Sequence, residues 1–123
     1  SNGASQINGG SNMIEITKEI LVNETNKTYD IWFERYLKNY DIKKEMLILA
    51  KQGKTSMKIA IRRSEIKESR DARMGYDSRF VDKLKKAFPE MRISVDIRKG
   101  MMGNEIGKII DINWGTEYPG GDL

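Results

Sequence analysis

The side chains best placed to do chemistry in this sequence are cations gathered near its middle. The densest group follows a predicted strand: Arg62, Arg63, Lys67, Arg70, Arg73 and Arg79. A second group lies at alternating positions of two predicted strands: Lys58, Arg62, Arg92 and Arg98. Such groups attract phosphates at long range and gain affinity from counterion release. Tyr76 lies beside them and offers a ring on which a base could stack. The pattern predicts a surface that contacts nucleic acid.

The charge of the chain is unevenly distributed. The formal net charge of the 123 residues is +4, but residues 35–100 carry nineteen Lys and Arg against nine Asp and Glu, a net charge of +10. The flanking residues 1–34 and 101–123 each carry a net charge of −3. A solvated or protein-binding surface is the alternative interpretation, because acids interleave with the cations and cancel part of their field. These acids are Glu65, Glu68, Asp71, Asp77 and Asp96.

The sequence contains no Cys and no His. Their absence excludes a thiolate nucleophile, an imidazole base, a Ser-His-Asp triad and the usual structural zinc sites. No disulfide can form, and no run of apolar residues is long enough to span a membrane. We therefore expect a protein without enzymatic activity, cofactor, metal or membrane segment, located in the cytoplasm.

Two short motifs suggest phosphate chemistry but fit it poorly. Glu90, Asp96 and Arg98 faintly follow the acid, acid-any-Lys order of magnesium nucleases, yet Arg stands where the lysine belongs and cannot release its proton. Gly53-Lys54-Thr55 ends like a phosphate-binding loop, but Ile48 occupies the position of the first glycine. We interpret Asp96 as a partner for a cross-strand cation and Gly53 as a helix stop.

Two groups of apolar side chains either pack in the core or contact a partner. Four aromatic residues recur at helical spacing: Trp32, Phe33, Tyr36 and Tyr40. We expect them to pack in the core; the alternative is that they form a groove for a partner or a dimer interface. Met101 and Met102 at a predicted turn either touch a partner or return to the core. A homodimer is therefore left open.

Helix start and stop signals divide the chain. We exclude residues 1–12 as a tag remnant or disordered leader, take 13–114 as a single domain, and read 115–123 as a flexible tail. Residues 13–22 have two interpretations: Met13–Ile16 begin a strand, or Thr17 caps a helix that continues through Val22, and we favour the helix. The main helices are predicted over 27–39 behind an Asn26 cap and over 42–52 behind an Asp41 cap. A last helix is predicted over 78–88, between the cap Asp77 and the stop Pro89.

Alternating apolar residues predict three strands, over 57–61, 92–98 and 106–114. The last two are close enough in sequence to form an antiparallel hairpin. Residues 63–76 are polar without a period and are predicted to be a long exposed loop, with at most a frayed helical turn.

The predicted fold class is α+β, in the order helix-helix-strand-helix-strand-strand, with a small, mainly antiparallel sheet covered by helices. The core is predicted to contain the following residues: Trp32, Tyr36, Leu49, Ile59, Ile61, Phe80, Leu84, Val95, Ile97, Ile110 and Ile112.

Two stretches resemble small uncharacterised proteins of phages and prophages in Gram-positive bacteria. One is EMLILAKQGKTS at residues 45–56 with the strand at 57–61, and the other is KIIDINWG at residues 108–115. In those proteins a helix ending Ala-any-any-Gly-Lys leads into a strand, and the chain closes on a strand with a late Trp. The resemblance implies an accessory phage gene product, a class often active against host defence systems such as CRISPR. It brings no catalytic residues.

The sequence thus predicts a basic phage or mobile-element protein that binds nucleic acid or a nucleoprotein complex in a bacterial host. The alternative is an anti-defence inhibitor, similar to anti-CRISPR proteins, that binds a host protein.

Overall fold

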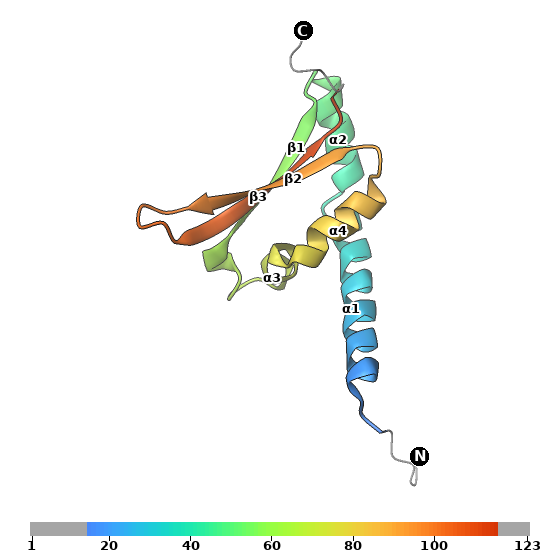
Figure 1. Cartoon of the computed structure of the whole chain (residues 1–123). Coiled ribbons are helices and arrows are strands. Elements are labelled where there is room, and N and C mark those ends of the chain that lie inside the picture. Colours follow the sequence, from blue (N-terminus) through green and yellow to red (C-terminus); the bar gives the residue numbers. More distant parts are fainter. Residues whose placement is uncertain (1–14, 116–123) are drawn as a thin grey trace. The chain divides into compact units, whose positions relative to one another are not determined.

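The computed structural model describes residues 15–115, so the leader expected at 1–12 and the tail expected at 115–123, apart from Gly115, lie outside the described residues. Figure 1 shows the helices and strands. The order is α1 (Lys18–Asn39), α2 (Ile42–Lys51), β1 (Ser56–Arg62), the 3-10 turn η1 (Arg63–Glu65), α3 (Arg70–Tyr76), α4 (Ser78–Ala87), β2 (Arg92–Lys99) and β3 (Glu105–Asn113). Helices that pack on a three-stranded antiparallel sheet confirm the α+β prediction. The chain divides after Trp32 into two compact units.

The first unit contains the beginning of α1. The N–H of Ile20 donates to Thr17 Oγ1 at 3.2 Å, so Thr17 caps this helix as predicted. The predicted second start at Asn26 is wrong, because α1 continues through it without a break. Thr25 Oγ1 donates to the Leu21 carbonyl at 2.8 Å, so the hydroxyl of Thr25 finds its acceptor within the helix itself.

Residues 33–115 form the second unit, in which α2 lies between two tight turns. Asp41 precedes α2 as predicted, but it adopts a left-handed conformation and its side chain makes no capping hydrogen bond. Gly53 ends the helix as predicted, with a φ of 84°. The N–H groups of Gly53 and Lys54 donate to the carbonyls of Ala50 and Leu49 at 2.9 and 3.0 Å, the pattern of a Schellman motif.

The prediction of a long loop over residues 63–76 is wrong, because η1 and α3 occupy much of it. Ser69 Oγ accepts from the Ala72 N–H at 3.1 Å and caps α3. Gly75 lies so close to β1 that an added Cβ would come within 2.9 Å of Ile61 Cδ1. A helix of seven residues is too short to display a clear apolar period, so this element could not be read from the pattern.

The helix α4 forms as predicted. The Asp77 carboxylate accepts from the Arg79 N–H at 2.9 Å, which caps its first turn. Phe80 and Leu84, one turn apart, are completely buried.

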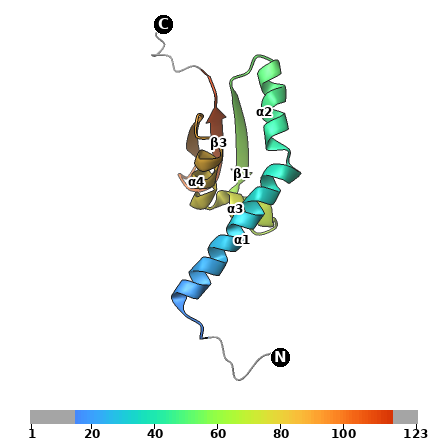
Figure 2. The ribbon, with the colours of Figure 1, turned by 90° about the vertical axis from the view of Figure 1, so that its right-hand side faces the viewer.

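The sheet has the order β1-β3-β2, so the predicted β2–β3 hairpin is confirmed while β1 and β2 are the two outer strands. Residues that face each other across antiparallel strands share one side of the sheet. Ile59, Ile110 and Val95 therefore share the apolar side, and Lys58, Asp111 and Ser94 share the other. Figures 1 and 2 together show α2 and α4 on the same side of this sheet. We call the opposite side, which carries Lys58, the helix-free face.

Most of the predicted core is confirmed. Buried side chains from that prediction are Trp32, Ile59, Ile61, Phe80, Leu84, Ile110 and Ile112, while Tyr36 and Leu49 are half-buried. Val95 and Ile97 lie on the apolar side but remain 39% and 42% exposed, so their assignment to the core is wrong. They belong to an outer strand that the helices cover incompletely.

Candidate nucleic-acid interface

A basic hollow of about 540 Å³ lies where β1 passes into η1. It is lined by Arg62, Arg63, Ser64, Lys67, Glu105 and Ile106. We call its three cations, Arg62, Arg63 and Lys67, the η1 basic cluster. All three are exposed to solvent, and all three belong to the group that the sequence predicted.

Local hydrogen bonds fix the turn that carries the η1 basic cluster. The N–H of Arg62 donates to Glu65 Oε1 at 3.0 Å, which closes η1 over the end of β1. The N–H of Ser69 then donates to the Glu65 carbonyl at 2.9 Å. The carboxylate of Glu65 is thus used to hold the turn and does not line the hollow.

Glu105 is the one carboxylate that lines the hollow. Its Oε2 accepts a short hydrogen bond from the Tyr76 hydroxyl. Burial, followed by this hydrogen bond, raises the pKa of Tyr76, while the nearby Arg63 opposes the shift. Three cations facing one hydrogen-bonded carboxylate leave the hollow with a net positive charge.

Tyr76 is half-buried beneath a lysine. The Lys108 ammonium lies 4.6 Å from the centre of the Tyr76 ring, and Lys108 itself is only 8% exposed. Together with the hydrogen bond to Glu105, this contact joins α3 to β3. Base stacking on Tyr76 remains a prediction, and because a cation lies over the ring we leave Tyr76 out of the interface.

The helix-free face collects four of the predicted cations. Lys58 lies opposite Asp111, and both Arg62 and Arg98 lie opposite Gly107. Arg92 lies on the same side, opposite Asn113. These cations share one face although β3 separates the two strands that carry them.

Several cations of the predicted set already have acceptors. Lys58 Nζ lies 3.1 Å from Asp111 Oδ1, and Arg98 Nη1 lies 3.0 Å from Asp96 Oδ2. The expectation that Asp96 pairs across strands is therefore wrong, since its partner is two residues away on β2. Arg92 Nη2 donates to Asn113 Oδ1 at 3.0 Å. These contacts weaken the positive field of the helix-free face.

Arg79 is held at the start of α4. Its guanidinium donates to both carboxylate oxygens of Asp77, at 3.1 and 2.9 Å. This arrangement lowers the pKa of Asp77 below its usual value, mainly through the side-chain hydrogen bond. Arg79 therefore stabilises a helix start and is a weaker candidate for a ligand contact.

Arg70 and Arg73 extend the positive surface along α3, which packs beside η1. Both are exposed. Within residues 15–115, no salt bridge engages Arg70, Arg73 or any member of the η1 basic cluster. The structure thus separates two sets of predicted cations. Lys58, Arg79, Arg92 and Arg98 are held by acceptors near them, whereas Arg62, Arg63, Lys67, Arg70 and Arg73 form no salt bridge within the described residues.

Sequence reasoning missed Ser64, Glu105 and Ile106 as neighbours of the η1 basic cluster. The missing information was the position of β3, whose register places Gly107 opposite Arg62. If β3 had been predicted to pair with both other strands, its first residues would have been expected beside the end of β1.

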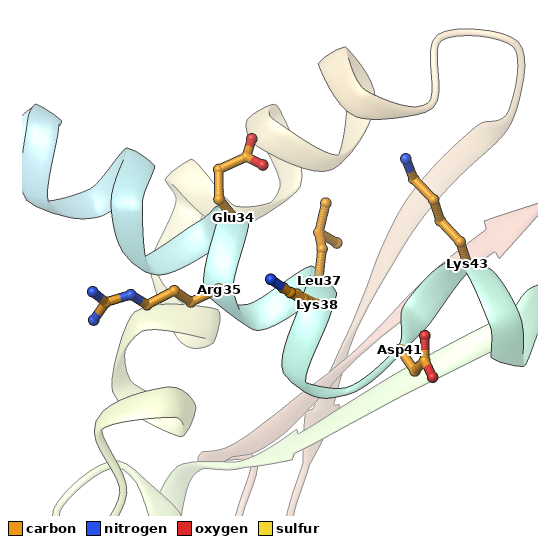
Figure 3. Close-up of a pocket in the computed structure, with 6 residues that line it drawn as sticks. All are labelled: Glu34, Arg35, Leu37, Lys38, Asp41 and Lys43. Atoms are coloured by element: carbon orange, nitrogen blue, oxygen red, sulfur yellow. The ribbon is translucent and has the colours of Figure 1, made fainter.

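A separate hollow of about 380 Å³ lies where α1 turns into α2 (Figure 3). Its lining residues are Glu34, Arg35, Leu37, Lys38, Asp41 and Lys43. Glu34, Leu37 and Lys43 point to the same side, whereas Arg35 extends away from them. Two carboxylates among three cations leave little net charge, so this hollow is a weaker anion site than the basic hollow.

The part of the chain that the structure describes contains no cluster of three or more acidic side chains arranged to hold a metal ion. None of the helices found there is both long enough and apolar enough to cross a membrane. Comparison of the chain with models of protein families, with curated proteins and with solved structures gives no match.

Proposed function

We propose that this is a non-enzymatic phage or mobile-element protein that binds nucleic acid through the η1 basic cluster. The observation that carries the proposal is the basic hollow, in which three exposed cations and the Ser64 hydroxyl face one hydrogen-bonded carboxylate. The phage origin rests on the resemblance of residues 45–61 and 108–115.

The chemistry of the cluster suits phosphates. The guanidinium groups of Arg62 and Arg63 can each donate two parallel hydrogen bonds to a phosphate, and Lys67 adds a compact charge. Phosphate contacts position a protein on nucleic acid without reading its sequence. We therefore expect binding that depends strongly on salt and weakly on base sequence.

The test measures binding of short fluorescent DNA and RNA, single- and double-stranded, over a series of salt concentrations. The variant Arg62→Glu/Arg63→Glu/Lys67→Glu removes the cluster. The control Lys43→Glu/Lys44→Glu/Lys51→Glu changes three exposed lysines of α2 and alters the net charge equally. Circular dichroism and thermal melting confirm that both variants are folded.

The cluster variant is expected to lose affinity, and the slope of log affinity against log salt should fall by about one for each phosphate contact removed. The α2 control should keep most of its affinity. If the cluster variant bound as tightly as the parent at low salt, or if both variants lost affinity equally, the site would be misassigned.

A second candidate function is favoured by an apolar hollow of about 390 Å³. It is lined by Lys43, Met46, Leu47, Ala50, Phe88, Met91 and Trp114. The elements that line it also carry lysines close by in the sequence, namely Lys44 and Lys51 on α2 and Lys85 and Lys86 in the last turn of α4. This surface suits an acidic host protein that inserts an apolar side chain, as an anti-defence inhibitor would require.

The two candidates are separated by affinity capture from nuclease-treated bacterial lysate. An inhibitor should retain its partner after nuclease treatment, lose it in Leu47→Glu, and keep it in the cluster variant. Leu47 is 56% exposed, so this substitution should leave the fold intact. Capture that disappears with nuclease or survives Leu47→Glu would argue against this second function.

A further inference from the structure

We propose that two copies of this chain associate through the outer edge of β2 and continue one antiparallel sheet across a two-fold axis. The proposal concerns self-association and does not depend on nucleic-acid binding. It rests on the unpartnered edge of β2, its exposed apolar side chains and the charge pattern along it.

β2 is an outer strand of the sheet. Its residues are all exposed except Ile93, which is half-buried. Within residues 15–115, β3 is the one strand that pairs with it, and no loop or helix backbone bonds to residues 92–99. Because a strand directs its N–H and C=O groups to both sides, those on the outer edge of β2 are available to another strand.

The apolar side of β2 lacks the cover that the other strands have. Val95 and Ile97 are 39% and 42% exposed, whereas Ile110, which faces Val95 from β3, is completely buried. The single irregularity of the β2–β3 pairing lies at Arg98/Lys99, so residues 92–98 present a regular edge. A second sheet edge would cover part of this exposed surface.

One register of two β2 strands brings opposite charges and apolar side chains together. With Ser94 on the two-fold axis, Arg92 faces the partner's Asp96, and Ile93 faces the partner's Val95. Each contact occurs twice by symmetry. Opposite-charge and β-branched pairs of this kind stabilise neighbouring strands.

The neighbouring registers are less favourable. An axis at Val95 places Arg92 opposite the partner's Arg98, and an axis at Asp96 places two carboxylates face to face. An axis at Ile97 pairs Asp96 with the partner's Arg98 but places Val95 opposite the partner's Lys99. Charge complementarity along β2 therefore favours the register centred on Ser94.

The present contacts of Arg92 and Asp96 allow both side chains to pair with the partner instead. The Asp96–Arg98 ion pair is solvent-exposed on both sides, at 66% and 56%, and such pairs are easily exchanged. Arg92 donates from Nη2 to Asn113 Oδ1 and to the Gly115 carbonyl. These acceptors are at the sheet surface, and a guanidinium with five N–H donors can contact a partner's carboxylate while it keeps contacts within its own chain.

The test is a charge exchange followed by sedimentation equilibrium over a range of protein concentrations. A single edge strand forms a small interface, so the parent is expected to dimerise with a dissociation constant of about 1–100 µM. Arg92→Asp and Asp96→Arg should each weaken the dimer by about tenfold or more, because each brings like charges together twice.

The sharpest result comes from recombining the charges. The double variant Arg92→Asp/Asp96→Arg should dimerise again, and the two single variants should form a heterodimer when mixed. Lys44→Asp is the control, because it changes the net charge equally at an exposed position of α2, away from the edge of β2. Val95→Arg, on the apolar side, should also yield a monomer and needs no change at Arg92.

Several results would overturn the proposal. A parent that remains monomeric at ~1 mM would exclude the dimer. Failure of the mixed single variants to associate, with each shown by circular dichroism to be folded, would exclude the register. Loss of the dimer in Lys44→Asp together with its persistence in Arg92→Asp would also exclude the register. If Arg92→Asp did not fold, a dimeric Val95→Arg variant would still refute the interface.

Discussion

The Asp77 carboxylate stabilises the start of α4 by accepting hydrogen bonds from both the backbone and the side chain of Arg79. It accepts from the Arg79 N–H at 2.9 Å and from the Arg79 guanidinium through both oxygens. Asp77→Ala is expected to lower the free energy of unfolding by about 1–2 kcal/mol, the usual cost of losing an N-cap. Chemical denaturation measures it, and Asp77→Asn, which retains a capping oxygen, should lose less. Equal losses for the two variants would contradict the capping role.

Tyr36 should make the stability of the protein sensitive to alkaline pH. Burial, with smaller contributions from Tyr40 and Asp71, raises the pKa of Tyr36 from 10.0 to about 12. Above pH 10 the unfolded chain releases this proton while the folded chain keeps it. The stabilisation is therefore complete below pH 10 and is lost as the pH rises towards 12.

Denaturation midpoints measured below and above pH 10 test this expectation. Tyr36→Phe keeps the ring that packs edge-on against Phe80, with 5.2 Å between centroids, but cannot ionise. Its midpoint should fall less steeply with pH than that of the parent. Parallel pH profiles for the two proteins would show that Tyr36 does not carry the effect.

The strands of the sheet differ in how much each contributes to the core. Ile59 on β1 is 9% exposed, whereas Val95 on β2 is 39% exposed. Ile59→Ala is expected to cost about 2–5 kcal/mol of unfolding free energy, and Val95→Ala less than about 1 kcal/mol. Denaturation at low protein concentration, where the monomer dominates, measures both. A similar loss at the two positions would mean that β2 is covered more completely than the structure shows.

The short helix α3 should be visible in hydrogen exchange. Residues 70–76 form a capped helix that packs on β1, so their hydrogen-bonded amides should exchange more slowly than an exposed loop would. Ser69→Ala removes the Oγ that accepts from the Ala72 N–H, and should speed exchange across α3. Unchanged exchange in this variant would remove the capping role assigned to Ser69.

Local signals explain what the sequence predicted well. Asp77 and Gly53 act within one turn of their own helix, so their roles follow from residue type and position. Alternation likewise identified all three strands and the buried side of β1. The order β1-β3-β2 depends on contacts between distant segments, which the pattern does not contain. For this reason the exposure of Val95 and Ile97 was missed.

In the candidate site, too, local features were predicted from the sequence and contacts between distant segments were not. The sequence identified Arg62, Arg63 and Lys67 as part of a basic group, because charge can be counted along the chain. It could not identify which cations are already paired, since Lys58 meets Asp111 only after β1 and β3 align. A basic composition therefore predicts a positive surface, while the strand order decides which part of it is available to a ligand.

At the scale of the whole molecule, the proposed dimer would place two η1 basic clusters on the same side of one sheet. A two-fold axis normal to the sheet keeps both helix-free faces together, since paired residues share a side. Arg62 lies in the row of Gly107 and Arg98, at the far end of the outer strand β1. From strand spacing and rise, the two Arg62 positions would lie about 36 Å apart in the Ser94-centred register.

That separation is roughly one turn of B-form DNA, so one duplex could contact both clusters. The affinity of the parent should therefore rise steeply as a duplex is lengthened from about half a turn to about one and a half turns. Arg92→Asp, which keeps the η1 basic cluster but lacks the dimer contact, should show only a shallow rise. Fluorescence anisotropy over a series of duplex lengths measures both. The same length dependence in the two proteins would show that each cluster binds alone, even if self-association and nucleic-acid binding were each confirmed.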